Sequence, residues 1–410
     1  MSNLSTDPYK GVRDFYPDDM AVQRYMFDVW SQTAESFGFE RYDASVLEPA
    51  DLYKAKGAEN EEMVNEQTYT FTDRGDREVT LRPEMTPTVA RMIAGKQREL
   101  KFPVRWYSIP NLFRYERAQR GRLREHWQLN CDIFGSDDFT ADVEMIALAY
   151  QIFMNFGADE SMFGIKVNSR AALDRHFAES GITDSEQIKS ITNLIDRKNK
   201  MEEAEFTAAL RENAGTDFSL PAETPVEVQQ ILDALRELGI ENAEYDPAIV
   251  RGFSYYTGTV FELFDTDPEN NRAMLGGGRY DNLTALFSNE SVSGVGFGFG
   301  DVTMRNFLES HNLMNAGLTS PTLMIMPMEA AQNLEAQKIA QQFRQAGVSV
   351  AVDMSDRKIG KKLSNAGEQF VDYALVLGED EVGQESFSLK NLTDGEEISG
   401  SIEELVNKIL

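Results

Sequence analysis

The sequence of 410 residues predicts an α+β protein made of two domains. Three observations lead to this prediction. Up to about residue 300, strand-like segments occur in hairpins and helical segments are set apart from them, which is typical of an antiparallel sheet. Residues from about 171 to 240 are helical and charged and lack strand signals, which predicts a helical insertion. Near the end strands alternate with helices, so we expect a first domain over residues 1–320 and a small α/β domain over residues 321–410.

In the first domain, residues 20–38 have the apolar spacing of a helix that ends at a glycine. The segment "FERYDASVLEPADLY" predicts a strand closed by Pro49, and "QTYTFTDRGDREVTLRPEM" predicts a hairpin with its turn at residues 74–76. Strand signals in "VRWYSIPNLFRY" and "HWQLNCDIFG" flank an arginine-rich loop. A helix in "FTADVEMIALAYQIFMNFG" and a strand in "MFGIKVNS" precede the insertion.

Strand signals return at "PAIVRGFSYYTGTVFELF", followed by "GGGRYDNL", by "VGFGFG" and by a helix over 302–310. The second domain begins with the strand "TLMIMPM" and a helix over 330–346. The strand "VSVAVDM", a helix from about 358, the strand "DYALVLG" and a hairpin follow. Its last helix, 402–409, has a capping box made by Ser401 and Glu404.

The overall charge limits the possible partners. The chain carries 68 acidic and 40 basic side chains, a formal net charge of -28, which argues against indiscriminate binding to nucleic acid or anionic lipid. No run of 18 apolar residues and no apolar signal-peptide core is present, so we expect no membrane segment. The single cysteine, Cys131, suits a reducing cytosol, so we expect a cytoplasmic protein. Three scattered histidines argue against a zinc site, and we expect no protein metal site.

Positive charge is nevertheless concentrated in one segment. Five arginines fall between Arg114 and Arg124. A run of charged residues is most often a solvent-exposed surface. Here, however, the residues are arginines, whose planar guanidinium groups can bind phosphate through two hydrogen bonds, and the run lies between two strands. The pattern predicts an arm over a nucleotide, in which Arg114 neutralises charge on a phosphate and the loop arginines contact a nucleic acid backbone.

Three further segments predict a binding site. In "VGFGFG", glycines at every second position leave one strand face without side chains, so a flat ligand can lie against the backbone. The spacing does not fit the dinucleotide fingerprint. In "RGFSYYTGTVFE", Arg251 precedes two tyrosines; strand tyrosines more often pack in a core, but the neighbouring glycines favour a ligand. In "LRPEMT", Glu84 is a candidate acceptor for an ammonium group.

Taken in this order, the segments resemble the histidyl-tRNA synthetases, a family of class II aminoacyl-tRNA synthetases. "FRYERAQRGRLREHWQLNCDIFG" is similar to class II motif 2 in its histidyl form. "RGFSYYTGTVFE" and "GGGRYDNL" resemble the two histidine-specific motifs, and the helix 20–38 with "VLEP" resembles motif 1. "VAVDMSDRKIGKKLSNAGEQFVDYALVLGEDE" resembles the class IIa anticodon-binding domain. The resemblance covers nearly the whole chain and is weakest in the insertion.

The resemblance implies a reaction and its participants. L-histidine reacts with ATP, with Mg²⁺ on the phosphates, to give histidyl-adenylate and pyrophosphate, and histidine then passes to the 3′ end of tRNA(His). Two anions must meet, so cations must lie where charge develops. The implied enzyme is a homodimer formed through motif 1, with residues 1–320 as its catalytic domain and residues 321–410 as its anticodon-binding domain.

The resemblance also implies the roles of individual residues. Arg114 and Arg251 are the implied catalytic residues, which hold the α-phosphate. The implied histidine site consists of Glu84, Thr86, Gln128, Asp132, Tyr255, Tyr256 and Tyr280. Of these, Glu84 and Gln128 take the ammonium end, and Asp132 and Tyr256 take the imidazole nitrogens. The implied ATP site consists of Arg114, Glu116, His126, Gly298, Gly300 and Arg305, and the implied tRNA contacts are Arg117, Gln119 and Arg120.

The sequence departs from the family pattern at three positions. Asp132 stands where glutamate is also common, and it is one carbon shorter. His126 replaces the phenylalanine that stacks on adenine, so we expect weaker or pH-sensitive packing. Thr303 stands where the arginine of motif 3 is expected, and Arg305 is the candidate to replace it.

Two alternatives remain open at this point. A non-catalytic paralogue, such as an ATP phosphoribosyltransferase regulatory subunit, would share the catalytic-domain fold, and the Thr303 departure favours it. The intact "RGFSYY" segment and the basic C-terminal domain argue against it. A plain RNA-binding protein would not need Glu84, Gln128 and Asp132 behind the arginine arm.

Overall fold

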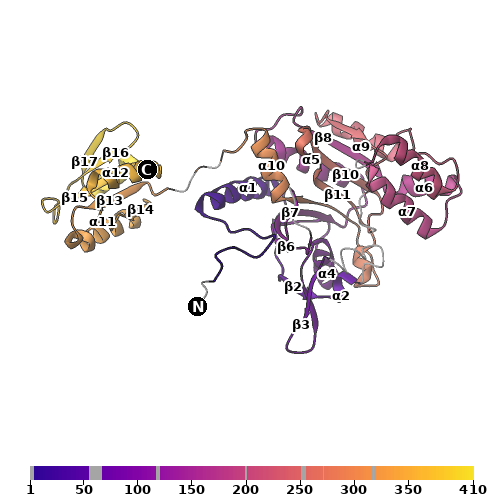
Figure 1. The fold of residues 1–410 in the computed structure, drawn as a ribbon, viewed down its shortest axis with the longest axis horizontal. Helices are drawn as coiled ribbons and strands as arrows, with labels where there is room; N and C mark the ends of the chain where they lie inside the picture. The colour runs from indigo at the N-terminus through magenta and orange to yellow at the C-terminus, as the bar shows by residue number, and fades with distance from the viewer. Residues whose placement is uncertain are drawn as a thin grey trace. The chain divides into compact units, whose positions relative to one another are not determined.

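The chain folds into two compact units, which are residues 1–315 and 316–410. The structure, a computed structural model, describes residues 4–54, 67–116, 121–198, 201–250, 255–270, 272–315, 317 and 320–410. The predicted boundary after residue 320 lies a few residues beyond this division. Figure 1 shows the ribbon of both units.

A nine-stranded sheet forms the centre of the first unit, in the order β1-β5-β7-β12-β11-β10-β8-β9, with β6 paired to β7 beside this path. Its strands are β1 (Glu40–Arg41), β5 (Val104–Ser108), β6 (Asn111–Phe113), β7 (Glu125–Phe134), β8 (Phe163–Ser169), β9 (Ala243–Tyr245), β10 (Thr259–Asp265), β11 (Ala273–Arg279) and β12 (Gly294–Gly300). The pairs β1–β5 and β8–β9 are parallel, and the other pairs are antiparallel. The predicted α+β architecture is therefore confirmed.

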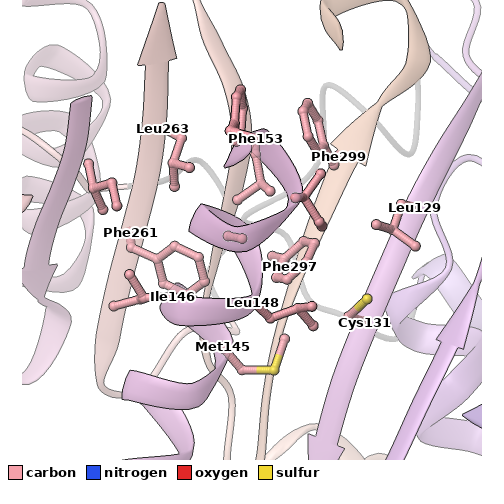
Figure 2. Close-up of a cluster of buried hydrophobic side chains, with 14 of the residues drawn as sticks. Leu129, Cys131, Met145, Ile146, Leu148, Phe153, Phe261, Leu263, Phe297 and Phe299 are labelled. Atoms are coloured by element: carbon pink, nitrogen blue, oxygen red, sulfur yellow. The ribbon is translucent and has the colours of Figure 1, made fainter. Parts of the chain in front are cut away.

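One face of this sheet is covered by apolar helices. They are α1 (Pro17–Ser36), α5 (Thr140–Asn155), α9 (Val226–Glu237) and α10 (Asp301–Ser310). Figure 2 shows α5 lying across the strands, with Ile146 and Phe153 of the helix next to Phe261, Phe297 and Phe299 of the sheet. These side chains are almost completely buried. Burial of so much apolar surface holds this face closed, so a ligand site can form only on the other face.

Smaller elements lie on the other face. A three-stranded sheet, in the order β2-β4-β3, consists of β2 (Leu47–Pro49), β3 (Tyr69–Thr72) and β4 (Glu78–Leu81). The helices α2 (Asp51–Lys54) and α4 (Thr86–Lys96) pack beside it. The predicted hairpin at residues 69–81 is present, and its turn contains Asp76 with a φ of 58°. The single strand predicted through Pro49 is instead two short strands and a helix. Residues 42–46, between the two strands, are not in a strand, although the Tyr42 amide donates to the Tyr107 carbonyl of β5 and the Val46 carbonyl accepts from the Arg82 amide.

The insertion is helical, as predicted, and has a small core of its own. Its helices are α6 (Arg170–Glu179), α7 (Ser185–Asp196) and α8 (Glu203–Ala214), followed by α9. Phe177, Ile191, Phe206 and Leu210 meet in this core, which is separate from the core under α5.

The second unit is an α/β fold with a five-stranded sheet in the order β14-β13-β15-β16-β17. Its elements are β13 (Leu323–Pro327), α11 (Asn333–Gln345), β14 (Val350–Val352), α12 (Ile359–Glu368), β15 (Tyr373–Leu377), β16 (Phe387–Asn391), β17 (Glu397–Gly400) and α13 (Ile402–Ile409). The predicted capping box is formed, since Ser401 accepts from the Glu404 amide and Glu404 accepts from the Ser401 amide. In the described part of the chain, no helix is long and apolar enough to cross a membrane.

Candidate active site

The site lies where β7 and β12 pair, because both strands divide their side chains between two faces. On β7, Leu129, Cys131 and Ile133 enter the core. Gln128 and Asp132 have the opposite parity and therefore lie on the open face. On β12 the bulky residues also face the core, and the glycines face the site. In each strand, alternate side chains thus face the hydrophobic core, and the residues between them face the pocket.

The glycines of β12 make room for side chains of the site. A methyl carbon added to Gly296 would lie 2.3 Å from Oδ1 of Asp132 and 2.7 Å from the Tyr280 hydroxyl. One added to Gly298 would lie 2.8 Å from Cδ of Gln128, and one added to Gly294 would lie 2.6 Å from the Tyr280 ring. The bare strand is therefore largely covered by the protein's own polar side chains, and a ligand would meet those side chains as well as the backbone.

A pocket opens on this face. Its lining residues come from six separate segments of the first unit: Glu84, Thr86, Arg114, Gln128, Asn130, Tyr255, Tyr256, Gly276, Tyr280, Gly296, Phe297 and Gly298. All the residues predicted for the histidine site line it except Asp132, which lies directly behind Gly296 and Tyr280. The pocket also contains Arg114 and Gly298 from the predicted ATP site.

Asp132 is the buried acid at the back of this pocket. Its Oδ1 accepts a hydrogen bond from the Tyr280 hydroxyl, and its Oδ2 is buried without a hydrogen-bond partner among the described residues. Burial raises the pKa of the Asp132 carboxyl to about 7, although the hydrogen bond from Tyr280 works in the opposite direction. Burial and the neighbouring Asp132 raise the pKa of Tyr280 far above its usual value, so this phenol stays a donor. One carboxylate oxygen thus remains for a ligand.

Three tyrosines form the wall beside Asp132. The ring centroids of Tyr255 and Tyr256 are 4.8 Å apart, and the ring of Tyr280 lies 5.8 Å from that of Tyr255. Gly278 on β11 provides the space for Tyr256, since an added methyl carbon would lie 2.8 Å from that ring. The sequence prediction gave Asp132 and Tyr256 to the imidazole. In the structure it is Tyr280 that is hydrogen-bonded to Asp132.

Arg114 and Glu84 are held together at the other side of the pocket. Arg114 follows β6, where its backbone amide donates to the Arg124 carbonyl at 2.9 Å. Its Nε donates to the carbonyl of Pro83 at 2.8 Å, directly before the buried Glu84. The Glu84 carbonyl accepts from the Tyr53 hydroxyl at 3.2 Å, which ties this turn to α2. A fixed guanidinium therefore stands near a fixed carboxylate.

The remaining arginines of the described arm have structural partners. Arg122 forms an ion pair with Glu116 at 3.1 Å, so the carboxylate predicted for ATP is already engaged. Arg124 lies over the ring of Tyr115, 3.9 Å from its centroid, and donates to the Glu116 carbonyl and the Tyr9 hydroxyl. The predicted tRNA contacts Arg117, Gln119 and Arg120 and the predicted catalytic Arg251 lie outside the described residues. Their roles stay predictions.

His126 lies on the same face of β7 as Gln128, and it is partly buried. Burial, and then the guanidinium groups of Arg114 and Arg13, lower the pKa of His126 to about 3. The ring is therefore neutral near pH 7, which argues against the expected pH-sensitive packing. Arg13 reaches this region from the N-terminal segment and pairs with the buried Asp301 at 2.6 Å.

Thr303 and Arg305 lie on α10, just after the glycine strand. The Thr303 hydroxyl donates to the carbonyls of Met274 and Gly300, each at 3.0 Å. Arg305 forms ion pairs with Asp19 at 3.2 Å and with Glu309 at 2.9 Å, and it does not line the pocket. Its guanidinium is thus occupied by acids, and this placement gives no support to Arg305 as the replacement for the motif 3 arginine. Gly300 is likewise absent from the lining residues.

The sequence analysis gave no site role to three lining residues, Asn130, Gly276 and Phe297, and it missed one structural pair. Asn130 shares the face of Gln128 and Asp132, so the period of two in β7 was sufficient to predict it. Gly276 lies opposite Gly298, and only the β11–β12 register reveals that. Arg13 and Asp301 are 288 positions apart, and no local pattern links them. In the described part of the chain, no group of three metal-ligating side chains occurs.

A mainly antiparallel sheet with a glycine strand and a pocket lined by Arg114, Glu84 and Gln128, in a chain that also holds a separate α/β domain, is the arrangement of a class II aminoacyl-tRNA synthetase. Residues 11–300 match the family described as histidyl-tRNA synthetase, and residues 322–410 match the anticodon binding domain. The chain belongs to the histidyl-tRNA synthetase family.

Relatives of similar length carry the same description. The histidine–tRNA ligase of Leptospira biflexa is 40% identical, with 99% of this chain and 98% of the relative covered. The histidine–tRNA ligase of Thermoplasma volcanium is 37% identical, with 98% of each chain covered. These full-length relatives favour the ligase over the regulatory paralogue.

Solved structures agree on the fold. The histidyl-tRNA synthetase from Nostoc sp. PCC 7120 superposes with a TM-score of 0.79 at 24% identity, covering 99% of both chains. A Bacillus halodurans protein, described as an ATP phosphoribosyltransferase regulatory subunit/histidyl-tRNA synthetase, superposes with a TM-score of 0.70 at 19% identity, covering 92% of this chain. Because both kinds of protein share the fold, the fold alone does not separate the two functions.

Proposed function

We propose that this protein ligates L-histidine to tRNA(His) in two steps. In the first step, a carboxylate oxygen of histidine attacks the α-phosphorus of ATP. The bond from that phosphorus to the bridging oxygen of the β-phosphate breaks, and its electron pair leaves with pyrophosphate. In the second step, the histidyl group passes from AMP to the 3′-terminal adenosine of the tRNA. The observation that carries the proposal is one pocket that joins Arg114 to Glu84, Gln128 and the Asp132–Tyr280 pair.

Histidine would lie with its imidazole toward Asp132. The free Oδ2 of Asp132 is an acceptor for a ring N–H, and its burial makes an unpaired state costly. An amino acid of similar size without that N–H would leave the carboxyl unpaired, so the pocket discriminates by the cost of an unmade hydrogen bond. Glu84 and Gln128 would take the ammonium end, with Thr86 beside them.

The nucleotide would lie along the arginine side of the pocket. Arg114, held by Pro83 and by the backbone of Arg124, is in place to neutralise the α-phosphate as charge develops there. Arg251 is proposed as its partner from the family pattern. His126 would stack on adenine as a neutral ring.

Mg²⁺ would arrive with the phosphates. Carboxylate oxygens are its preferred protein ligands, but Glu116 is paired with Arg122 and Asp301 with Arg13. The described residues therefore fit a metal held mainly by phosphate oxygens. When bound, it would add positive charge at the phosphates.

Binding of tRNA(His) is proposed for the arginine arm and for the second unit, whose matched family is an anticodon binding domain. Phosphate contacts would make the affinity fall steeply with salt. A homodimer formed through α1 and β2, and a cytosolic location, stay predictions.

The test is histidine-dependent exchange of labelled pyrophosphate into ATP, followed by charging of tRNA(His). We expect both activities from the purified full chain. Folded protein that catalyses no exchange would support the regulatory paralogue instead. Pyrophosphate exchange without charging of tRNA(His) would support adenylate formation but contradict the proposal that the protein transfers histidine to tRNA.

A further inference from the structure

The outer phosphates of the nucleotide still lack an assigned cation. When the bond to the α-phosphorus breaks, negative charge moves onto the departing pyrophosphate, and a positive side chain at that end lowers the barrier. Neither residue considered so far supplies this charge: Thr303 is neutral, and Arg305 is paired with Asp19 and Glu309. The question is therefore which other guanidinium reaches the open face.

Most described arginines near this face are already paired with an acceptor. Arg13 holds Asp301, and Arg122 holds Glu116. Arg124 is stacked on Tyr115 and donates to a carbonyl. Arg279 holds the buried Asp142 behind β11. Each of these would have to leave its partner before it could bind a phosphate, and for Arg13, Arg122 and Arg279 this would leave an acid unpaired.

Arg272 is different. It is exposed, and its guanidinium makes no hydrogen bond or ion pair with another residue in the described part of the chain. It directly precedes β11, and its backbone amide donates to the Asn270 carbonyl at 2.8 Å. The β10–β11 register shifts between Leu263 and Phe264, so the alternation of faces along β11 is interrupted before Arg272, and its contacts decide where its side chain lies.

Arg272 also lies close to Gly121 and to Thr303 of α10. A methyl carbon added to Gly121, at the end of the arginine arm, would lie 3.8 Å from Cδ of Arg272 and 3.9 Å from Cγ2 of Thr303. The Thr303 hydroxyl in turn donates to the carbonyl of Met274, two residues after Arg272. Arg272 therefore stands beside Thr303, at the point where β11, α10 and the arm come together.

The position lies at the correct end of the site. Three side chains lie on the open face of β7. In order of distance from the imidazole end of the pocket they are Asp132, Gln128 and His126. The Gly121–Thr303–Arg272 contact lies further in the same direction, since Gly121 precedes β7. A nucleotide whose α-phosphate is at Arg114 would have its remaining phosphates within reach of this corner.

We propose that Arg272 supplies the cation for the β- and γ-phosphates of ATP, from the neighbouring strand rather than from α10. This inference rests on the proposed function. The planar guanidinium would bind the phosphate oxygens in pairs and would neutralise the pyrophosphate as it leaves. Thr303, with its short side chain, leaves the space that Arg272 would occupy.

The test compares binding of ATP with binding of AMP, because AMP lacks the outer phosphates. In Arg272→Ala we expect the affinity for ATP to fall about tenfold to a hundredfold, the size of a lost hydrogen bond to a charged group. The affinity for AMP should change less than about twofold, as for any residue that makes no contact with it. Arg272→Lys, which keeps the charge but not the fork, should lie between the two.

Three further variants make the result decisive. Arg236→Ala, which removes an exposed arginine paired with Asp233 in the insertion, is the matched control and should change neither affinity. The double variant Arg272→Ala/Thr303→Arg puts a guanidinium back in the same corner and should recover part of the ATP affinity. Arg305→Ala tests the competing residue, and a selective loss of ATP affinity there, with none in Arg272→Ala, would overturn the proposal.

Other outcomes also contradict it. Equal losses of ATP and AMP affinity in Arg272→Ala would make the residue structural. Unchanged ATP affinity with a raised KM for tRNA in charging would assign Arg272 to the tRNA instead. Wild-type protein that catalyses no pyrophosphate exchange would refute the proposed function, whereas active wild type with normal ATP binding by Arg272→Ala would refute only this inference.

Discussion

The two ends of the pocket are built in opposite ways. The end proposed for the imidazole, the imidazole end, is buried, and its one acid, Asp132, keeps an oxygen without a partner among the described residues. At the end proposed for the nucleotide, the nucleotide end, most of the described arginines are paired with acids or stacked on rings. At the imidazole end, a ligand that leaves the buried Asp132 carboxyl without a hydrogen bond would bind at a free-energy cost, and this cost would provide selectivity. At the nucleotide end, the arginines provide positive charge that solvent and salt can screen. Changes at the two ends should therefore affect different measured quantities.

The largest effect is expected at the nucleotide end. Arg114→Ala removes the guanidinium proposed for the α-phosphate, and we expect pyrophosphate exchange to fall by about a hundredfold to a thousandfold. The melting temperature should fall little, because among the described residues the Arg114 side chain loses one hydrogen bond, to the Pro83 carbonyl. Arg77→Ala, in the exposed β3–β4 hairpin, is the control. A large loss of stability in Arg114→Ala would show that this arginine belongs to the framework.

The next largest effect is expected at Gly296, whose missing side chain leaves room for Asp132 in the pocket. In Gly296→Ala the new methyl group would lie 2.6 Å from the Cys131 carbonyl and closer still to Asp132. Backbone cannot move aside easily, so we expect exchange to fall about a hundredfold through misplacement of Asp132. Thermal unfolding should show a loss of about 1–3 kcal/mol. Gly164→Ala, on β8 with open space around it, is the matched control and should change neither.

The third effect depends on pH and belongs to the imidazole end alone. The pKa of Asp132 is about 7 in the folded state, above the usual value of about 4 in the unfolded chain. The folded state therefore holds this proton more tightly, and the free energy of unfolding falls as the pH rises from about 4 to about 7. The Asp132→Asn variant lacks this titrating carboxyl group, so its free energy of unfolding should not have this contribution to its pH dependence.

The variant should gain stability relative to wild type across that range, by at most about 4 kcal/mol, while its KM for histidine rises. Chemical unfolding at pH 5 and at pH 8 measures the difference. A constant difference between the two proteins would mean that Asp132 does not titrate as its burial implies. Asp138→Asn, at an exposed acid before α5, provides the comparison for an acid with a lowered pKa.

The smallest effect is expected at His126. Because its pKa is about 3, the ring is neutral from pH 6 to pH 8, and His126→Phe replaces one neutral ring with another. We expect the KM for ATP to change less than about threefold, with the same pH dependence for both proteins. A KM that depends on the protonation of His126 in this range would show that the nucleotide end is as sensitive to burial as the imidazole end.

Much of this molecule follows from its local patterns. The period of two in β7 and β12 predicts which residues face the core and which face the site, and the helical spacing of residues 20–38 and 402–409 predicts α1 and α13. The order of the sequence motifs is sufficient to predict the family. These features are local because backbone geometry repeats over two or about four residues. The sequence analysis missed helix α4, whose Val89, Ala90 and Ile93 are buried, and it did not predict the break in the strand before Pro49.

The partners of the charged groups could not be predicted in this way. The sequence suggests Arg305 for the nucleotide because it is nearest in the chain to Thr303, yet Asp19 from α1 engages it. Arg272 lies about thirty positions before Thr303, and only the β11 register and the fold of α10 bring the two together. The sequence alone thus determined the alternation of faces and the family, since both are written in local spacing. The tertiary structure decided which oxygen of Asp132 lacks a partner, and which arginines have one, among the described residues, because burial and pairing depend on segments that are far apart in the chain.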